Sequence, residues 1–321
     1  MTENLTAPRR VVFVHAHPDD ETLATGVSIA HHVLAGDDVT VLTCTLGDEG
    51  EIIPPDLAHL AADAEDRLGA YRRGELWAAL YRLGARGVLL ADEETELPGE
   101  GPGFFRDSGM AGTEANRREG ALAHVELEEI VTRLTAALEA LEPDIVVTYD
   151  ETGGYGHPDH VRVHEATVAA TGRLSRTPAL YEVVTPRSWI SRDRQWVLDH
   201  VDPARFTTAG GGRYQLPTIE DEHIPSAVDD ATVTHVVEGS PTALALRDAA
   251  LREHRTQVVV HDGWFALSND IATRLPRAEA FIRLDPHTGR RLPGAGEPRP
   301  LESAAESPLG RSSDERPEAG A

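Results

Sequence analysis

The chain has 321 residues, enough for one large domain or two smaller ones. Hydrophobic residues make up 40% of it and aromatic residues only 5%, a composition that indicates a globular protein with an aliphatic core. Fifty-four acidic against 30 basic residues give a formal net charge of −24, which argues against a nucleic-acid partner. The sequence has no lysine, which excludes a P-loop lysine, a Schiff-base lysine and a pyridoxal-phosphate anchor.

The first 180 residues alternate apolar runs with helical periodicity. The apolar runs predict strands near 11–14, 39–45, 88–90, 145–149 and 180–184. Apolar residues at helical spacing predict helices over about 23–34, 57–83, 127–141 and 159–174. This alternation predicts an α/β fold, with a doubly wound, mostly parallel, Rossmann-like sheet and right-handed crossovers.

Beyond residue 185 the alternation weakens, which divides the chain into three parts. We expect residues 1–185 to form the metal-binding core and residues 186–285 to form a smaller C-terminal unit that completes the pocket. Residues 286–321 contain six prolines and almost no large apolar side chains, which predicts a disordered tail. The acidic segment 91–103, rich in glycine and proline, predicts a long loop near the site.

The single cysteine, Cys44, lies at the end of an apolar run, and we interpret it as a buried structural thiol. One cysteine excludes an intramolecular disulfide and a cysteine-based zinc cluster. No apolar run approaches the ~18 residues of a membrane span, and the stretch 11–14 is too short for a signal peptide. We therefore expect a cytoplasmic protein with no membrane partner.

Two motifs rich in histidine and carboxylate residues follow predicted strands directly. They are His15-Ala16-His17-Pro18-Asp19-Asp20-Glu21 and the stretch that runs from Thr148-Tyr149-Asp150 to Gly153-Gly154-Tyr155-Gly156-His157-Pro158-Asp159-His160. Ligands of doubly wound sheets bind at the carboxyl ends of strands, and an imidazole and a carboxylate three residues apart in a tight turn can meet one metal ion. Either motif alone could be a polar helix start. Their joint occurrence favours a metal site.

Two histidines and one carboxylate are typical of a catalytic zinc site with open positions, and they suit ferrous iron as well. Competing active sites lack their motifs in this chain. No G-x-S-x-G nucleophile elbow is present, and no G-x-G-x-x-G sequence opens the first predicted helix. The motifs therefore favour metal-dependent hydrolysis over a serine nucleophile or a dinucleotide cofactor.

The paired motifs resemble those of the LmbE-like metal-dependent deacetylases, and the resemblance spans about residues 10–285. Further segments are similar to one branch of this family, the deacetylases of the mycothiol pathway: Thr43–Glu51, Gly69–Arg72, Arg106–Thr113 and Thr256–Val260. The resemblance implies an enzyme that hydrolyses the acetamide of N-acetylglucosaminyl-inositol, a small amino-sugar substrate, to the free amine and acetate.

The resemblance also implies roles for individual residues. Matched by position, His17, Asp20 and His160 bind one zinc ion per chain, or Fe²⁺, and Asp19 is the general base that takes a proton from the attacking water. The groups that polarise the carbonyl, stabilise the oxyanion or orient a neighbouring histidine match Tyr155, His157 and Asp159. The positions near the sugar or inositol hydroxyls match Arg72, Asp107 and Glu51.

Two alternatives stay open at this point. The first is a related activity, either the amidase of mycothiol S-conjugates or deacetylation of another amino sugar. The amidase branch carries a lysine shortly after its His-Pro-Asp-Asp turn, where this chain has Ala24, which favours the deacetylase. The second is a non-enzymatic sugar-binding module, against which the retention of every candidate catalytic group argues. The oligomeric state is also open.

Overall fold

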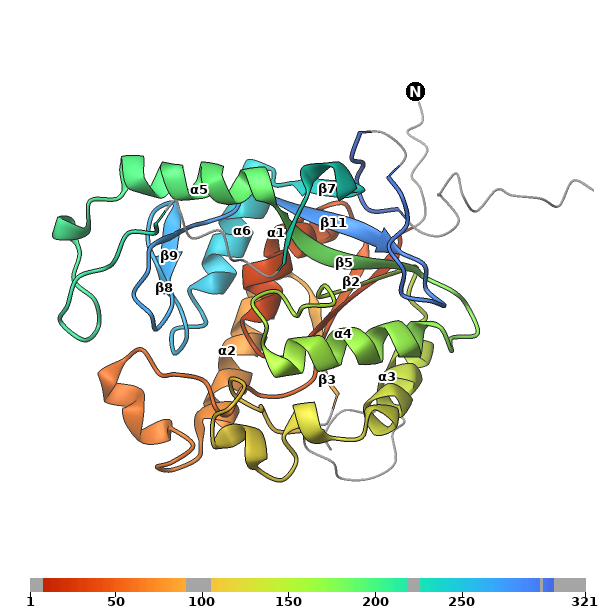
Figure 1. Ribbon diagram of the computed structural model, residues 1–321, viewed down its shortest axis with the longest axis horizontal. Helices are drawn as coiled ribbons and strands as arrows, with labels where there is room; N and C mark the ends of the chain where they lie inside the picture. Colours follow the sequence, from red (N-terminus) through yellow and green to blue (C-terminus); the bar gives the residue numbers. More distant parts are fainter. Residues whose placement is uncertain (1–7, 91–104, 219–225, 295–296, 303–321) are drawn as a thin grey trace, which may run out of the picture.

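A central sheet with helices on both faces organises the protein (Figure 1). The computed structural model describes residues 8–90, 105–218, 226–294 and 297–302. The segment 91–103, expected to be a long loop, lies outside the described residues, as does 303–321 of the expected tail. Among the described residues, no helix has the length and apolar composition needed to cross a membrane.

Within the described chain, eight strands form this sheet. Their order is β3 (Arg86–Leu89), β2 (Asp38–Thr43), β1 (Arg10–His15), β4 (Ile145–Thr148), β5 (Ala179–Pro186), β11 (Ala278–Leu284) and β7 (His235–Glu238), with β6 (Ala227–Val228) paired to β5. All pairings among β1 to β6 are parallel, whereas β11 pairs antiparallel with both β5 and β7. The predicted doubly wound, mostly parallel α/β fold is confirmed.

The alternation of side chains along β1 explains its continuous apolar sequence. Val11 and Phe13 pack under the helices of one face, and Val12 and Val14 pack under those of the other. The first face carries α1 (Asp20–Leu34), α2 (Leu68–Leu83) and α6 (Pro241–Leu251). The second face carries α3 (Leu127–Leu141) and α4 (Pro158–Thr171). Short 3₁₀ helices span Pro55–Leu60, Ala115–Arg117, Leu122–His124, Pro203–Arg205 and Asp230–Thr232.

The single helix expected over 57–83 is interrupted. Its first part is the 3₁₀ helix Pro55–Leu60, and α2 begins only at Leu68. Between them the backbone of Ala61 is extended at ψ 155°, and Asp66 is left-handed at φ 51°. An L-residue leaves the right-handed helix in either conformation, so the chain turns before α2 starts.

Part of the C-terminal unit expected over 186–285 belongs to the central sheet. Strands β11 and β7 extend that sheet, and α6 packs beside α1 and α2 on the first face. The remainder forms a smaller layer of α5 (Arg187–His200) and a three-stranded antiparallel sheet, β8 (Val259–Val260), β9 (Trp264–Ala266) and β10 (Thr273–Arg274). Sequence alternation missed these strands because they are short and antiparallel.

The described start of the expected tail packs against the edge of the sheet. The backbone N–H of Arg299 donates to the Thr234 carbonyl, and its carbonyl accepts from the Val236 N–H. The side chain of Leu301 is 1% exposed and joins the main core. The expectation of disorder from residue 286 is therefore wrong for these residues, because one apolar side chain and two main-chain hydrogen bonds dock them.

Strands β1 and β4 are parallel neighbours, and the connections that follow them lead to opposite sides of the sheet. The chain after β1 returns through α1 to β2, and the chain after β4 returns through α4 to β5 on the other side. A doubly wound sheet has its ligand-binding crevice at such a switch point, outside the carboxyl ends of the strands. Both histidine motifs follow these two strands, so the fold brings them together.

Candidate active site

Three side chains from the two motifs form a triangle of donor atoms. Nδ1 of His17 lies 3.3 Å from Nε2 of His160 and 3.3 Å from Oδ2 of Asp20. The third edge, from Oδ2 of Asp20 to Nε2 of His160, is also 3.3 Å. A tetrahedral ion with bonds of about 2.0–2.1 Å has edges of about 3.3–3.4 Å between its ligands. The donors therefore fit one such ion with a fourth position open.

Tyr149, the residue after β4, orients two members of the triangle. Its hydroxyl donates to Oδ2 of Asp20 at 2.7 Å and accepts from the Ala16 N–H at 2.7 Å. Its ring stacks on His160, with centroids 4.2 Å apart and planes at 10°. Nδ1 of His160 lies 3.2 Å from the Gly153 carbonyl, which leaves Nε2 facing the triangle. Burial raises the pKa of Tyr149, so its hydroxyl stays a neutral donor.

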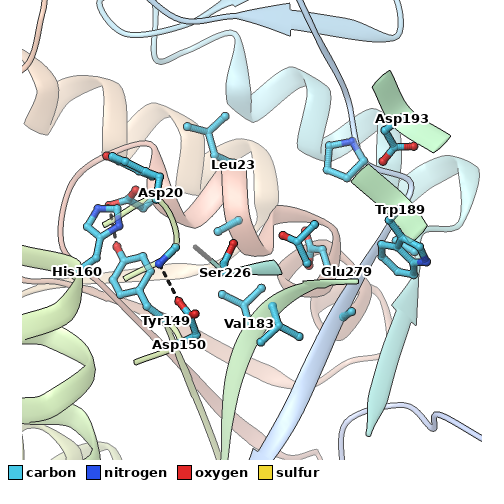
Figure 2. A pocket seen from close by; sticks show the side chains of 18 of the residues that line it. Asp20, Leu23, Tyr149, Asp150, His160, Val183, Trp189, Asp193, Ser226 and Glu279 are labelled. Carbon is cyan, nitrogen blue, oxygen red and sulfur yellow. Dashed lines mark hydrogen bonds and ion pairs between the residues drawn. The ribbon is translucent and has the colours of Figure 1, made fainter. Parts of the chain in front are cut away.

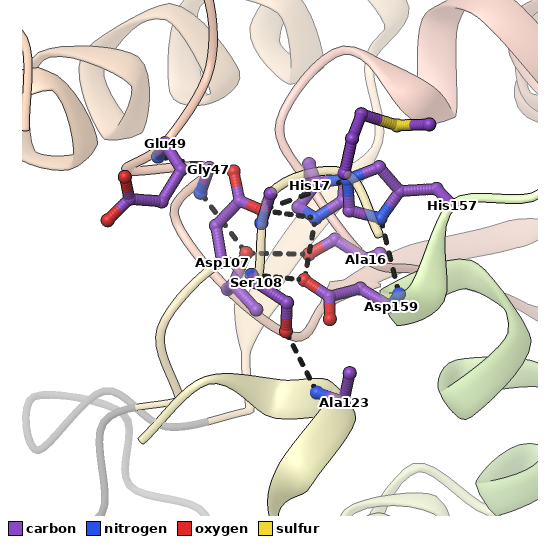
Figure 3. A network of polar contacts seen from close by, with 12 residues as sticks. Ala16, His17, Gly47, Glu49, Asp107, Ser108, Ala123, His157 and Asp159 are labelled. Carbon is purple, nitrogen blue, oxygen red and sulfur yellow. Dashed lines mark hydrogen bonds and ion pairs between the residues drawn. The ribbon is translucent and has the colours of Figure 1, made fainter. Parts of the chain in front are cut away.

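The far nitrogen of His17 faces two carboxylates (Figure 3). Nε2 lies 3.1 Å from Oδ2 of Asp159 and 3.4 Å from Oδ1 of Asp107. Burial opposes a charge on His17, but these carboxylates and Asp20 raise its pKa well above the usual value. With its proton on Nε2, the ring presents Nδ1 to a metal, as ligand histidines commonly do. Asp159 thus contacts a histidine of the first motif, His17, 142 positions away.

Asp159 and Asp107 are themselves held by the backbone of one loop. Oδ2 of Asp159 accepts from the Ser108 N–H at 2.8 Å, and Oδ1 of Asp107 accepts from the Gly109 N–H at 2.8 Å. Two wider groups of possible ligand atoms lie within 4.8 Å of one another: His17, His157 and His160, and His17, Asp107 and Asp159. In the second group the carboxylates share the protonated face of the imidazole, which favours an orienting role for both.

Asp19 occupies a strained position at the start of α1. Its φ of 109° is a conformation that typically costs about 1–3 kcal/mol for a residue other than glycine. Its side chain makes no capping hydrogen bond to the helix, so a capping role does not explain it. Burial raises the pKa of Asp19 to about 6, although the Arg72 guanidinium, 3.3 Å from Oδ1, opposes this shift. The carboxylate is poised to exchange a proton near neutral pH.

Arg72 is committed to protein groups rather than open to a ligand. Its guanidinium donates to the Gly47 carbonyl at 2.8 Å and to the Pro18 carbonyl, and its side chain is 3% exposed. The structure thus places Arg72 behind the Asp19 turn. Glu51 is exposed, and no described contact joins it to the other site residues. The three expected hydroxyl ligands therefore do not form one cluster, because Asp107 lies against His17.

His157 and Tyr155 flank the triangle. Nδ1 of His157 accepts from the Asp159 N–H at 3.2 Å, which places the ring proton on Nε2. Burial, together with His17 and His160, lowers the pKa of His157 to about 3, so it acts as a neutral donor. The Tyr155 ring lies 5.1 Å from that of His160 and is 59% exposed, so it borders the mouth of the site.

A cavity of about 320 Å³ opens beside the triangle (Figure 2). Asp20 and His160 lie at one end, and Trp189 lies at the other. Most of its wall is aliphatic or aromatic, but besides Asp20 the buried carboxylates of Asp150 and Glu279 also line it. The Glu279 oxygens accept two N–H groups of α1 at 2.8 Å. Burial raises the pKa of Glu279 to about 7. Ala24 lies in this wall, so the expected lysine of the amidase branch has no counterpart here.

Comparisons with known proteins agree with this geometry. The family model described as GlcNAc-PI de-N-acetylase, PIG-L, matches residues 12–171. The chain is 45% identical over 284 residues to the 1D-myo-inositol 2-acetamido-2-deoxy-alpha-D-glucopyranoside deacetylase of Actinosynnema mirum, covering 87% of this chain and 93% of that one. It is 41% identical over 279 residues to the deacetylase of the same name from Streptomyces avermitilis, covering 85% and 91%.

The chain belongs to the PIG-L family of de-N-acetylases. The predicted resemblance to LmbE-like deacetylases is thereby confirmed. The fold is also similar to that of a deacetylase of the teicoplanin biosynthesis pathway, solved as a bog complex. That structure is 17% identical, has a TM-score of 0.51 and covers 86% of this chain and 99% of its own.

Within this PIG-L fold, the structure adds site residues that the sequence motifs do not reveal. Tyr149 lies at the start of the second motif, but nothing in the local sequence shows that its hydroxyl reaches Asp20. Ser108 contributes only a backbone N–H, which no side-chain motif records. His254 lies 233 positions from the motif residue that it contacts, Glu21, and carries no sequence signal of its own.

Proposed function

We propose that this PIG-L protein hydrolyses the acetamide of 1D-myo-inositol 2-acetamido-2-deoxy-α-D-glucopyranoside to the free amine and acetate, in the cytoplasm, as a step of mycothiol biosynthesis. The observation that carries this proposal is the triangle of His17, Asp20 and His160 beside the strained Asp19. The names of the relatives at 41% and 45% identity support the substrate.

The triangle accounts for the metal requirement of such a reaction. We assign to it one zinc ion per chain, with His17, Asp20 and His160 as the protein ligands. The 3.3 Å edges and the open fourth position support this assignment. When bound, zinc supplies a Lewis acid that polarises a carbonyl and lowers the pKa of water.

Asp19 performs the proton transfers in this proposal. With a pKa of about 6 its carboxylate is mostly ionised at neutral pH, so it can accept a proton from the attacking water. The protonated carboxyl then supplies that proton to the leaving amine nitrogen. Arg72 holds the carboxylate and the Pro18 carbonyl, which fixes the direction from which Asp19 acts.

His157 and Tyr155 stabilise the oxyanion that develops on the amide oxygen. The Nε2–H of neutral His157 is a donor in a buried setting, and a donor of this kind is worth about 10²–10³ in kcat. The Tyr155 hydroxyl at the mouth supplies a second donor once substrate is bound. Glu51, in the loop after β2, is proposed to contact a hydroxyl of the substrate. Arg72 and Asp107 act on the site indirectly, Arg72 through Asp19 and Asp107 through His17.

A substrate panel tests the function. The purified protein is assayed with N-acetylglucosaminyl-inositol, N-acetylglucosamine and a mycothiol S-conjugate, with released primary amine detected by fluorescence and metal content measured on the same sample. The proposal expects the highest kcat/KM for N-acetylglucosaminyl-inositol. A higher kcat/KM for the S-conjugate would establish the amidase activity instead. If no substrate released amine, the remaining alternative would be a non-enzymatic sugar-binding module.

A further inference from the structure

A fully buried ion pair lies beside the triangle without contributing an atom to it. Oε1 of Glu21 lies 2.7 Å from Nε2 of His254, and both side chains are 0% exposed. Glu21 belongs to the first turn of α1, whereas His254 follows α6 and lies 233 positions later in the sequence. Since no part of either side chain reaches solvent, neither can touch a substrate.

The pair reaches Asp19 through the main chain. Oε2 of Glu21 accepts a hydrogen bond from the Asp19 backbone N–H at 2.9 Å. The carbonyl of the same peptide unit, that of Pro18, accepts from Arg72. One peptide unit is thus held at both ends, and it is the unit that leads into the residue at φ 109°. A non-glycine residue keeps such a conformation only where its surroundings enforce it.

A contact with α2 anchors the segment that carries His254. Two residues later, Thr256 donates to the Glu75 carboxylate with its N–H at 2.9 Å and its hydroxyl at 2.6 Å. Glu75 belongs to α2, the helix that also carries Arg72. Both contacts that hold the Pro18–Asp19 peptide therefore depend on α2, one directly through Arg72 and one through the segment after α6.

We propose that Glu21 and His254 are positioning residues, which hold the Pro18–Asp19 peptide in its strained conformation so that the Asp19 carboxylate faces the scissile amide. This inference rests on the proposed function, because it takes Asp19 as the base. If the pair only stabilised the core, its substitution would change folding. If the pair positions Asp19, its substitution lowers kcat, and this loss depends on the presence of Asp19.

The test is a double-mutant cycle on kcat in the zinc-loaded, full-length enzyme, with N-acetylglucosaminyl-inositol as substrate. His254→Phe fills a similar volume but removes the donor to Glu21. In the presence of Asp19 it should lower kcat roughly tenfold to a hundredfold, with KM and bound zinc unchanged. In the Asp19→Asn background the same substitution should cost less than about twofold, because coupled residues are not additive. His254→Gln, whose amide can donate in place of Nε2, should restore most of kcat.

His235→Phe is the matched control. His235 is an equally buried histidine on β7, beside Tyr181, and it has no described contact with the Asp19 turn. Its loss should lower Tm and leave kcat unchanged in either background. If His254→Phe yields no folded protein, His254→Asn takes its place in the cycle, since its shorter side chain stays polar but does not reach Glu21.

Equal losses of kcat in both backgrounds, or wild-type kcat in His254→Phe, would overturn the proposal. A crystal structure of the zinc-loaded variant gives a readout that is independent of the substrate. Asp19 should leave φ 109° while His17, Asp20 and His160 keep their places; an unchanged Asp19 would also overturn the proposal. A failure of the proposed function is distinguishable from these outcomes, because the wild-type enzyme itself would then release neither acetate nor amine.

Discussion

The hydroxyl of Tyr149 donates to Oδ2 of Asp20 over 2.7 Å and so ties the end of β4 to the start of α1. This oxygen also forms the triangle with His17 and His160. The same oxygen also accepts the His17 backbone N–H at 2.9 Å, so two hydrogen bonds from the protein orient this carboxylate. A side chain at the start of the second motif therefore ties that motif to the first one.

Tyr149→Phe should weaken metal binding without abolishing it. Loss of a hydrogen bond to a ligand typically costs 10–100-fold in metal affinity or activity, and we expect the zinc Kd to rise by about that factor. Competition with a chromophoric chelator measures it. Tyr81→Phe, on the exposed face of α2, is the control and should leave the Kd unchanged. An unchanged Kd in Tyr149→Phe would show that Asp20 does not depend on this contact.

Asp19→Asn should separate metal binding from catalysis. The near-isosteric amide keeps the turn, and the triangle of His17, Asp20 and His160 still holds the ion, but the amide cannot accept a proton from water. General-base assistance is typically worth ~10²–10⁴, so kcat should fall by at least about two orders of magnitude with zinc near the wild-type level. Near-wild-type kcat with full zinc occupancy would rule out Asp19 as the base.

The two motifs predict the triangle of His17, Asp20 and His160 because the signals that place these residues are local in the sequence. Spacing within each turn, and the place of each turn after a strand, suffice to bring His17, Asp20 and His160 to the switch point between β1 and β4. The parallel part of the sheet follows for the same reason, since each buried strand is a continuous apolar run.

The contacts that orient the site depend on chain segments far apart in the sequence. The guanidinium of Arg72 turns to Pro18, 54 positions away, where it serves the turn rather than a substrate hydroxyl. His254 meets Glu21 only because α6 packs beside α1 and α2. No periodicity in one segment reports such packing, and the antiparallel strand β11 that extends the sheet lies outside the strand-helix alternation.

The pH dependence of kcat/KM should report Asp19. Its carboxyl must be ionised to act as a base, so activity should rise with pH through an acid limb near pH 6. The Arg72 guanidinium lowers the pKa of Asp19 against the effect of burial. Arg72→Met should therefore move the acid limb to higher pH. A limb that stays in place in Arg72→Met, or that persists in Asp19→Asn, would assign it to another group.

Two truncations should distinguish the docked part of the C-terminal segment from the rest. A chain ending at Glu302 keeps Leu301 in the core and the Tyr181 hydroxyl bonded to the Glu302 carbonyl, and we expect an unchanged Tm. A chain ending at Gly294 loses these contacts and the main-chain pairing of Arg299 with β7. Removing a buried leucine side chain typically costs about 2–5 kcal/mol.

The shorter chain should therefore melt at least about 3 °C lower, since an unfolding entropy of about 2.1 cal/mol/K per residue makes 1 kcal/mol worth roughly 1.6 °C in a protein of about 300 residues. Leu301→Ala in the full-length chain separates the core contact from the strand pairing and should reproduce part of the loss. The zinc Kd and kcat should stay at wild-type values in every variant at temperatures well below Tm, because Leu301 packs far from the triangle, at the opposite end of the sheet from the strand ends that carry His17 and His160. Equal Tm values for the two truncations would mean that residues 297–302 contribute nothing to the stability of the core.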